Sequence, residues 1–326
     1  MSAMSGMSVL ITRRLLQLPL VLGLILTITF ALLWIIPGNP MENEGRRPSA
    51  EVAEAMRRQY QLDQPGAFLA QYAARASGIA WIAGAHPTPF DLGPSMRHPD
   101  WSVNEIIAAG LPVSATIGLG AIAIALIVGS IAGVIGGLRP GSWSDGATQA
   151  LALVGISVPS FVTGSLLLVL LAAKLRLVPV GGWGTPAHAL LPMLTLSLPF
   201  AAYIARLLRF GLADQMQTHY VRTAMAKGLS RREAAVRHAL KNAFLPVLSY
   251  LGPATAIAMT GSFVVEKVFA VPGLGRHFVD GVLGKDITLV MGVVLVYAAL
   301  LVLLNLLVDI LYAWIDPRIE IAARPQ

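Results

Sequence analysis

Six long apolar runs, each of about twenty residues or more, dominate the sequence and limit what the chain can fold into. A run of that length crosses a bilayer as an α-helix, because a helix satisfies its own backbone polar groups in lipid. Only 13% of the residues are charged, about half the share found in soluble domains. The sequence therefore predicts an all-α polytopic membrane protein. Its six transmembrane helices are expected at residues 15–36, 111–138, 147–173, 190–210, 245–265 and 287–314.

The basic residues predict how these helices are oriented, because Lys and Arg gather in the cytoplasmic loops of membrane proteins. Arg13 and Arg14 precede the first apolar run, which is longer than the core of a signal peptide and is interpreted as an uncleaved span. With six spans, both termini are then cytoplasmic. The formal net charge of +7 follows from these loops and does not indicate a nucleic-acid partner. The chain has no cysteine, which excludes disulfides and thiolate metal sites.

The chain is predicted to divide into three parts. Residues 1–36 hold the cytoplasmic N-terminus and the first span, and residues 37–102 form an external loop subdomain with mixed charges and Pro/Gly turns. Within that subdomain, Ser49–Tyr60 has the pattern of a short amphipathic helix with Ser49 as its cap. Residues 103–326 form a five-span core that contains a long cytoplasmic loop at 211–245.

Several residues inside the spans are expected to affect how the helices pack rather than to take part in a reaction. Gly129, Gly133 and Gly137 repeat every four residues in the second span, which favours close contact with another helix. Pro159 interrupts the third span and is expected to kink or loosen it. In the sixth span, Asp309 with Asn305 one turn earlier favours a structural hydrogen bond over a proton relay, which would need partners nearer mid-membrane.

The loop at 211–245 is much longer than a connection in a compact bundle needs to be. After residue 219 it carries six Lys or Arg residues against the single acid Glu233. The alanine-rich residues before Gly228 favour a helix, and Ser230 with Glu233 three residues later has the pattern of a capping box. We therefore predict a protruding hairpin of helix, glycine turn and helix.

This loop carries a family resemblance. The stretches YVRTAMAKGL and RHALKNAFLP resemble the cytoplasmic coupling loop of bacterial ABC-importer permeases in the oligopeptide, dipeptide and nickel group. In the family, Glu-Ala-Ala is followed by three residues and Gly, with Leu-Pro further on; here Arg222-Thr223-Ala224 stands at the first position, followed by Gly228 and by Leu245-Pro246. The literal triplet Glu233-Ala234-Ala235 lies after the glycine and is interpreted as coincidence. The resemblance extends to the Asp316-Pro317-Arg318-Ile319 end and is strongest for the B subunits of oligopeptide permeases.

The resemblance implies the type I ABC-importer permease fold and a coupling loop that docks onto an ATP-hydrolysing subunit. On the external side it implies a gate or a binding-protein docking surface in the signature after the fifth span. For Glu266 the sequence leaves open whether it lines the gate or faces water. The coupling residues so assigned are Tyr220, Arg222, Thr223, Ala224, Ala226, Lys227, Gly228, Leu229, His238, Ala239 and Leu240, and the external ones are Glu266, Pro272, Gly273 and Gly275.

The resemblance also implies partners and a location. This chain would form half of a translocation pathway for short peptides in the bacterial cytoplasmic (inner) membrane. The other half would come from a second, homologous permease chain. Two ATP-binding subunits would supply the ATP and Mg²⁺ sites, so that this chain needs no cofactor of its own. An external substrate-binding protein would deliver the peptides to the outer loops.

No catalytic motif is found in the sequence. Gly284-Lys285 is followed by Asp286 and has Val279 where a Walker A motif needs its first glycine. The six histidines show no metal-ligand spacing, so neither a catalytic nor a metal site is predicted, and a membrane hydrolase is disfavoured for want of a nucleophile and base. The alternative is an ATP-independent secondary transporter or channel. It predicts mid-membrane charges or paired broken helices, to which the prolines of the third and fourth spans give weak support.

Overall fold

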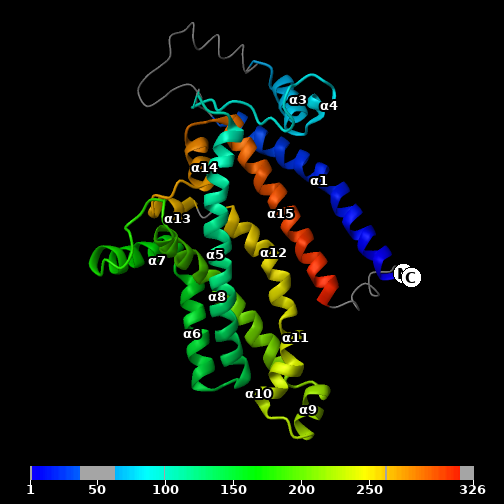
Figure 1. The fold of residues 1–326 in the computed structure, drawn as a ribbon, viewed down its shortest axis with the longest axis vertical. Helices are drawn as coiled ribbons and strands as arrows, with labels where there is room; N and C mark the ends of the chain where they lie inside the picture. The colour runs from blue at the N-terminus through cyan, green and yellow to red at the C-terminus, as the bar shows by residue number, and fades with distance from the viewer. Residues whose placement is uncertain (1, 37–62, 99, 261–262, 316–326) are drawn as a thin grey trace. The chain divides into compact units, whose positions relative to one another are not determined.

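The computed structural model describes residues 2–36, 63–98, 100–260 and 263–315, and these are helical almost throughout (Figure 1). The helix predicted at 49–60 and the residues 316–319 lie outside the described residues. The long helices are α1 (Ser2–Ile35), α5 (Val103–Leu138), α8 (Pro186–Gln215), α12 (Leu245–Met259) and α15 (Ile287–Ile315). The shorter ones are α3 (Pro65–Ala76), α4 (Ile79–Ile82), α6 (Trp143–Ser157), α7 (Ser160–Leu167), α9 (His219–Ala226), α10 (Arg231–Ala234), α11 (Leu240–Ala243), α13 (Phe263–Val268) and α14 (Leu274–Leu283), with π-helices η1 (Leu168–Lys174) and η2 (Ala235–Ala239).

Five stretches of helix among the described residues are long and apolar enough to cross a membrane, and a bent pair makes up to six. This agrees with the predicted all-α polytopic fold. Most ends lie within about five residues of those expected, whereas the second stretch begins earlier than predicted, at Val103 instead of residue 111. The five are Leu16–Ile35, Val103–Leu138, Pro186–Gln215, Leu245–Val268 and Ile287–Leu311, and the bent pair is Trp143–Ser157 with Ser160–Lys174.

The third predicted span is broken rather than kinked. Its two halves meet at an angle of 102°. Val158, the residue before Pro159, has an extended backbone with φ −83° and ψ 123°, so α6 ends at Ser157 and α7 begins at Ser160. A proline ring disfavours helical geometry in the residue before it and cannot donate a backbone hydrogen bond. The break therefore follows from Pro159, which the sequence predicts to interrupt this span.

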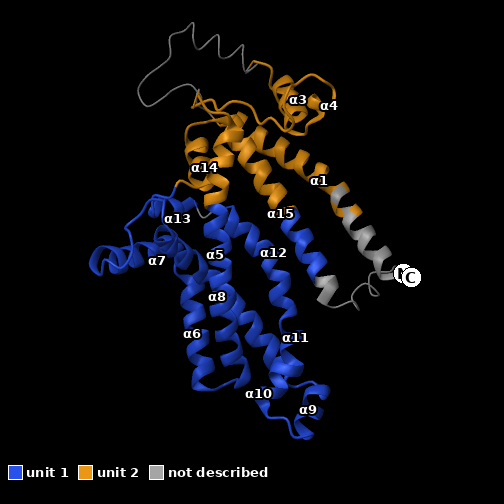
Figure 2. Cartoon of the chain, viewed as in Figure 1, with its two compact units in different colours: residues 1–11, 114–271, 303–326 blue, residues 12–113, 272–302 orange. Residues whose placement is uncertain are grey.

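The chain divides into two compact units, coloured separately in Figure 2. Unit 1 comprises residues 1–11, 114–271 and 303–326. In this unit α8 packs against α6, α7, α11 and α12. A Cβ placed at Gly129 would lie 2.5 Å from the Ala201 carbonyl oxygen, and one at Gly133 would lie 2.8 Å from that of Ala205. The glycine repeat in α5 therefore allows close contact with α8, as the sequence predicts.

Unit 2 comprises residues 12–113 and 272–302. Its core joins side chains from α1, α3, the start of α5, α14 and the start of α15. The segment 63–102 therefore contributes Phe68, Tyr72, Leu92 and Met96 to one hydrophobic core with the ends of membrane helices. Burial of this apolar surface is the main force that holds the segment in place.

Asp286 fixes the beginning of α15 inside unit 2. Its side chain is fully buried and accepts hydrogen bonds from the Leu289 backbone N–H at 3.1 Å and from the Thr288 hydroxyl at 3.0 Å. It also accepts from the Ser95 hydroxyl and, at 3.2 Å, from the Arg97 backbone N–H. A buried carboxylate with this many donors is well compensated. Asp286 thus caps α15 and ties it to the loop before α5.

Candidate functional site

The loop between α8 and α12 is a compact helical structure. After α8 ends at Gln215, the chain forms α9, turns at Gly228, and continues through α10, η2 and α11 into α12. The predicted order of helix, glycine turn and helix is therefore correct. The second arm is less regular than predicted, because a π-helical turn at Ala235–Ala239 separates two four-residue α-helices.

Gly228 ends α9 in a Schellman motif. The Gly228 N–H donates to the Met225 carbonyl at 3.0 Å, and the Leu229 N–H donates to the Ala224 carbonyl at 3.3 Å. Gly228 has φ +100°, a backbone conformation that costs an L-residue energy. A Cβ added there would meet nothing within 4 Å. Glycine is therefore favoured at this position by the backbone angle. It is not favoured by any lack of space for a side chain.

Ser230 and Glu233 form the predicted capping box at the start of α10. The Glu233 carboxylate accepts from the Ser230 backbone N–H at 2.9 Å and from its hydroxyl at 2.8 Å. The Glu233 N–H donates back to the Ser230 hydroxyl oxygen at 3.3 Å. These hydrogen bonds, with a smaller contribution from Arg237, lower the pKa of Glu233. The turn between the two arms is thus held at both sides, by a cap on each helix.

The inward face of the loop is built from small apolar side chains. Val221, Ala234 and Ala239 are completely buried, and Ala224 is 7% exposed. Such small residues let the short helices lie close to each other and to α8. Two of the residues predicted to contact a partner, Ala224 and Ala239, therefore lie inside the loop. They support the outer surface rather than forming part of it.

Three hydrogen bonds fasten the loop to the spans and to itself. The Tyr220 hydroxyl donates to the Gln215 side-chain carbonyl at 2.7 Å, and the Asn242 amide donates to the Tyr220 hydroxyl oxygen at 3.0 Å. Tyr220 thus links the end of α8 to α11. The Arg231 guanidinium donates from Nε to the carbonyl oxygen of Leu138, the last residue of α5, at 2.7 Å. Displacement of the loop would therefore pull on α5 and α8 directly.

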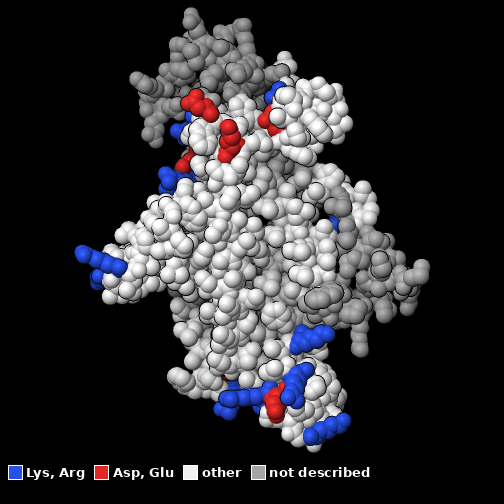
Figure 3. All heavy atoms as spheres, viewed as in Figure 1, with Lys and Arg blue, Asp and Glu red and all other residues white. Residues whose placement is uncertain are grey.

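The outward face is strongly basic. In Figure 3 Lys and Arg side chains gather over the end of unit 1 formed by α9 and α10, around a single acid. Leu229 and Leu240 are half-buried at the edge of this face. Val236, which the sequence did not single out, is 65% exposed and directly precedes Arg237. We call this surface the basic face; its exposed residues are Tyr220, Arg222, Thr223, Ala226, Lys227, Gly228, Arg231, Arg232, Val236, Arg237, His238 and Lys241.

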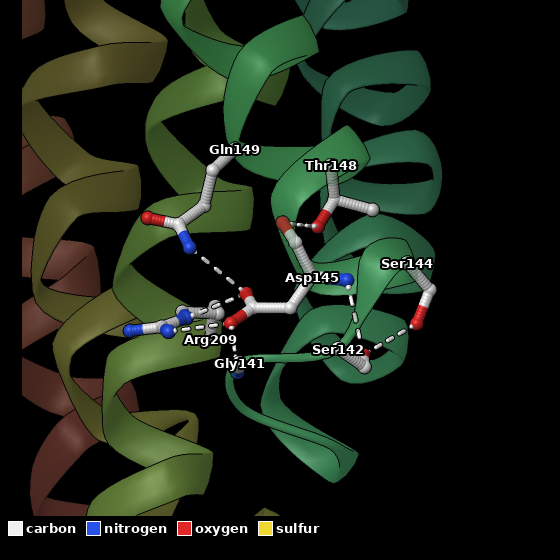
Figure 4. Close-up of polar contacts among 7 residues, drawn as sticks. All are labelled: Gly141, Ser142, Ser144, Asp145, Thr148, Gln149 and Arg209. Atoms are coloured by element: carbon white, nitrogen blue, oxygen red, sulfur yellow. Dashed lines mark hydrogen bonds and ion pairs between the residues drawn. The ribbon is translucent and has the colours of Figure 1, made fainter.

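An ion pair between the buried Asp145 and the half-buried Arg209, not foreseen from the sequence, joins α6 to α8 in unit 1 (Figure 4). The Arg209 guanidinium donates from Nε to Asp145 Oδ1 at 2.9 Å and from Nη2 to Oδ2 at 2.7 Å. Asp145 also accepts from the Gln149 amide at 3.0 Å and from the Gly141 N–H at 2.8 Å. The two Asp145 oxygens therefore receive four hydrogen bonds, which compensate for burial of the charge. Arg209 lies on the last turns of α8, which lead into the loop.

The predicted external residues lie in different units. Glu266, in α13 of unit 1, is 1% exposed and accepts a hydrogen bond from the Ser114 hydroxyl at 2.6 Å. Glu266 therefore does not face water, which was one of the two alternatives that the sequence left open for it. In unit 2, Gly273 and Gly275 are buried and Pro272 is exposed. A Cβ at Gly110 would lie 3.1 Å from the Leu274 backbone, so the glycine at position 110 lets α5 lie close to the start of α14.

These observations define a polytopic α-helical membrane protein with a structured basic loop between two of its helices. Residues 125–321 match the family described as binding-protein-dependent transport system inner membrane component. The chain belongs to this family, and it is a permease subunit of that class of transport system.

Comparisons with individual proteins agree with this assignment. The chain is 40% identical to the dipeptide transport system permease protein DppB of Bacillus subtilis (strain 168), over 91% of this chain and 93% of that protein. It is also 40% identical to the oligopeptide transport system permease protein OppB of Escherichia coli (strain K12), over 95% of this chain and 98% of that protein. The fold resembles that of the MetNI methionine ABC transporter, with a TM-score of 0.54 and 16% identity over 65% of this chain and 96% of that one. The family match and these two relatives favour a permease subunit of such a transport system over a secondary transporter or channel.

Proposed function

We propose that this chain forms half of the translocation pathway of an ATP-driven peptide importer, with its basic face docked onto an ATP-hydrolysing subunit. The observation that supports the proposal most is the construction of the loop at 211–245. Its backbone is capped on both sides of Gly228, and hydrogen bonds fasten it to α5 and α8. A loop built this rigidly can transmit a displacement to the spans.

The charge of the basic face suits an acidic groove on the partner. Between residues 219 and 243 the loop carries six Lys or Arg residues and one acid. Complementary charge steers association and fixes the orientation of the partners. ATP and Mg²⁺ would be bound by two such partner subunits, and this chain would contribute mechanical coupling rather than catalysis.

The distribution of basic residues supports a cytoplasmic position for this loop and for both termini, in the inner membrane of a bacterium. The short loops expected on the opposite side carry fewer basic residues than the cytoplasmic loops do. Those of the opposite side are Lys174, Arg176, Lys267, Arg276 and Lys285. A cytoplasmic basic face would meet ATP-hydrolysing subunits where ATP is available.

The peptide substrate is inferred from the two relatives that are 40% identical over nearly their whole length and whose names specify dipeptide and oligopeptide transport. A second, homologous permease chain would complete the pathway. Peptides would arrive from an external binding protein that docks on the outer loops. Selection by that protein would explain why a pathway subunit needs few charged residues in its spans.

Co-purification and an ATPase assay test this function. The chain would be expressed with the products of neighbouring genes, reconstituted in liposomes, and assayed with and without an external binding protein loaded with short peptides. Several-fold stimulation of ATP hydrolysis by the loaded protein, together with peptide uptake, is the expected result. Peptide uptake by the chain alone without ATP would contradict the proposal and favour a secondary transporter.

A further inference from the structure

An exposed apolar turn lies in the segment between the first and second spans. Residues 64–85 contain one charged residue, Arg75, and no acid. Within this stretch Ile79 is 61% exposed, Trp81 is 51% exposed and Ile82 is 78% exposed. All three belong to the short helix α4. A water-soluble surface rarely gathers three large apolar side chains on a single turn, so this turn requires an explanation.

The neighbouring helix α3 packs against one end of each of two candidate membrane spans. The Phe68 ring is 5.6 Å from the Phe30 ring and 6.3 Å from the Trp34 ring, measured between centroids. Both of these partners belong to the last turns of the span Leu16–Ile35. The Tyr72 hydroxyl donates to the backbone carbonyl of Thr288, in the first turn of α15, at 3.3 Å. Helix α3 therefore packs against the last turns of α1 and the first turn of α15.

Helix α4 is held rigidly to α3. The Ser77 N–H donates to the Ala73 carbonyl and the Gly78 N–H to the Arg75 carbonyl, and Gly78 reverses the chain with φ +79°. The Phe90 ring closes the turn, with its Cε1 atom 3.5 Å from the position a Gly78 Cβ would take. Backbone hydrogen bonds from Ala85 and His86 to the Ala80 carbonyl end the helix. The apolar side chains are thus presented by a fixed structure.

We propose that α4 is an interfacial anchor whose Ile79, Trp81 and Ile82 side chains insert into the head-group region of the bilayer. The same unit also exposes large apolar side chains on the candidate membrane span of α1, among them Leu24, Ile28 and Leu32. Tryptophan is favoured at this depth because its ring is apolar and its N–H is polar. The absence of acids in 64–85 avoids repulsion from anionic lipids. The anchor would hold the outer ends of α1 and α15 at a constant depth.

The absence of cysteine allows a direct test with single-cysteine variants. Ile82→Cys would carry a nitroxide spin label on the full-length chain in nanodiscs of zwitterionic and anionic phospholipid. Collisions with oxygen, which partitions into lipid, would be compared with those of a water-soluble nickel chelate. Leu24→Cys, at an exposed position of the first span, is the lipid control, and Gln71→Cys, at an exposed polar position of α3, is the aqueous control.

The ratio of collisions with oxygen to collisions with the nickel chelate should be several-fold higher for a label at position 82 than for one at position 71. It should approach the ratio for a label at position 24. A ratio equal to that at Gln71 would overturn the proposal, because the turn would then be in water. Protection from both reagents would also overturn it, since a protein surface would then cover α4. As an independent measurement, brominated lipids should quench a component of the tryptophan fluorescence that disappears in Trp81→Phe. Equal quenching in the unsubstituted protein and in Trp81→Phe would contradict insertion.

Discussion

The Arg231 side chain, at the start of α10, donates a hydrogen bond to the carbonyl oxygen of Leu138, where α5 ends. The two residues are 93 positions apart in the chain, and the Arg231 Nε atom lies 2.7 Å from the Leu138 carbonyl oxygen. The carbonyl groups of a last helical turn lack partners within the helix, so a guanidinium there both caps α5 and attaches the loop to it.

Replacing Arg231 by alanine is expected to loosen α10 from α5. The loss is about 1 kcal/mol, as for a typical hydrogen bond, and the spans should remain folded. Hydrogen exchange of the backbone amides in 230–234 should become several-fold faster, and peptide uptake per ATP hydrolysed should fall. Arg232→Ala, at the adjacent exposed arginine, is the matched control. Equal effects of the two variants would show that charge, and not this contact, matters.

The loss of ATP-coupled uptake caused by substitutions at Gly228 should depend on backbone strain and not on side-chain volume. The expected order of ATP-coupled uptake is Gly above Asn above Ala above Val, because φ +100° disfavours β-branched residues most. The penalty is about 1–2 kcal/mol for alanine, confined to the loop since a Cβ meets no neighbour. Uptake and ATPase rates measured in proteoliposomes check the order. Full coupling in Gly228→Val would remove Gly228 from the coupling mechanism.

Acid should weaken the capping box. Because the folded-state pKa of Glu233 is lowered by its hydrogen bonds, the ionised carboxylate stabilises the turn above the carboxyl's unfolded pKa. That contribution is lost as the pH falls through the folded-state pKa. Hydrogen exchange of the Arg231 and Glu233 amides, corrected for the intrinsic rate, should therefore show less protection in acid than at pH 7. Glu233→Gln should reduce this dependence; an unchanged dependence would place its origin elsewhere.

The ion pair of Asp145 and Arg209 should contribute strongly to the stability of unit 1. Removing Arg209 leaves the Asp145 charge buried, and removing Asp145 leaves the Arg209 charge partly buried, so each change should cost up to about 3 kcal/mol. Asp145→Asn and Arg209→Gln should each lower the thermal unfolding midpoint of the purified chain by several degrees. The double variant should lose less than the sum of the two, as expected for residues in contact. Additive losses would mean that the pair contributes no coupling energy.

The sequence predicts local structure correctly where hydrogen bonds between nearby residues determine it. Gly228 ends a helix, and Ser230 with Glu233 begins the next, because the hydrogen bonds involved span three to five residues. The glycine repeat of α5 was also informative, since helical spacing alone places these residues on one face.

What depends on tertiary contact could not be predicted. The partners Asp145 and Arg209 are 64 positions apart, and nothing in either local sequence indicates the other. Pro159 signalled a disruption, but the 102° bend depends on how the two halves pack. Ala224 and Ala239 were assigned to the docking surface from a motif, which specifies positions in the chain and not the direction of a side chain.

Site-specific photo-cross-linking tests the central claim, that the basic face contacts an ATP-hydrolysing subunit. A photoreactive amino acid would replace Arg222 or Lys227, both exposed, or Val180, which is 56% exposed in a loop expected on the opposite side. In the purified, ATPase-active complex, adducts with the ATP-binding subunit should form from positions 222 and 227 and not from 180. An active complex that yields no adduct at 222 or 227, or equal adducts at 180, would contradict the docking of this loop.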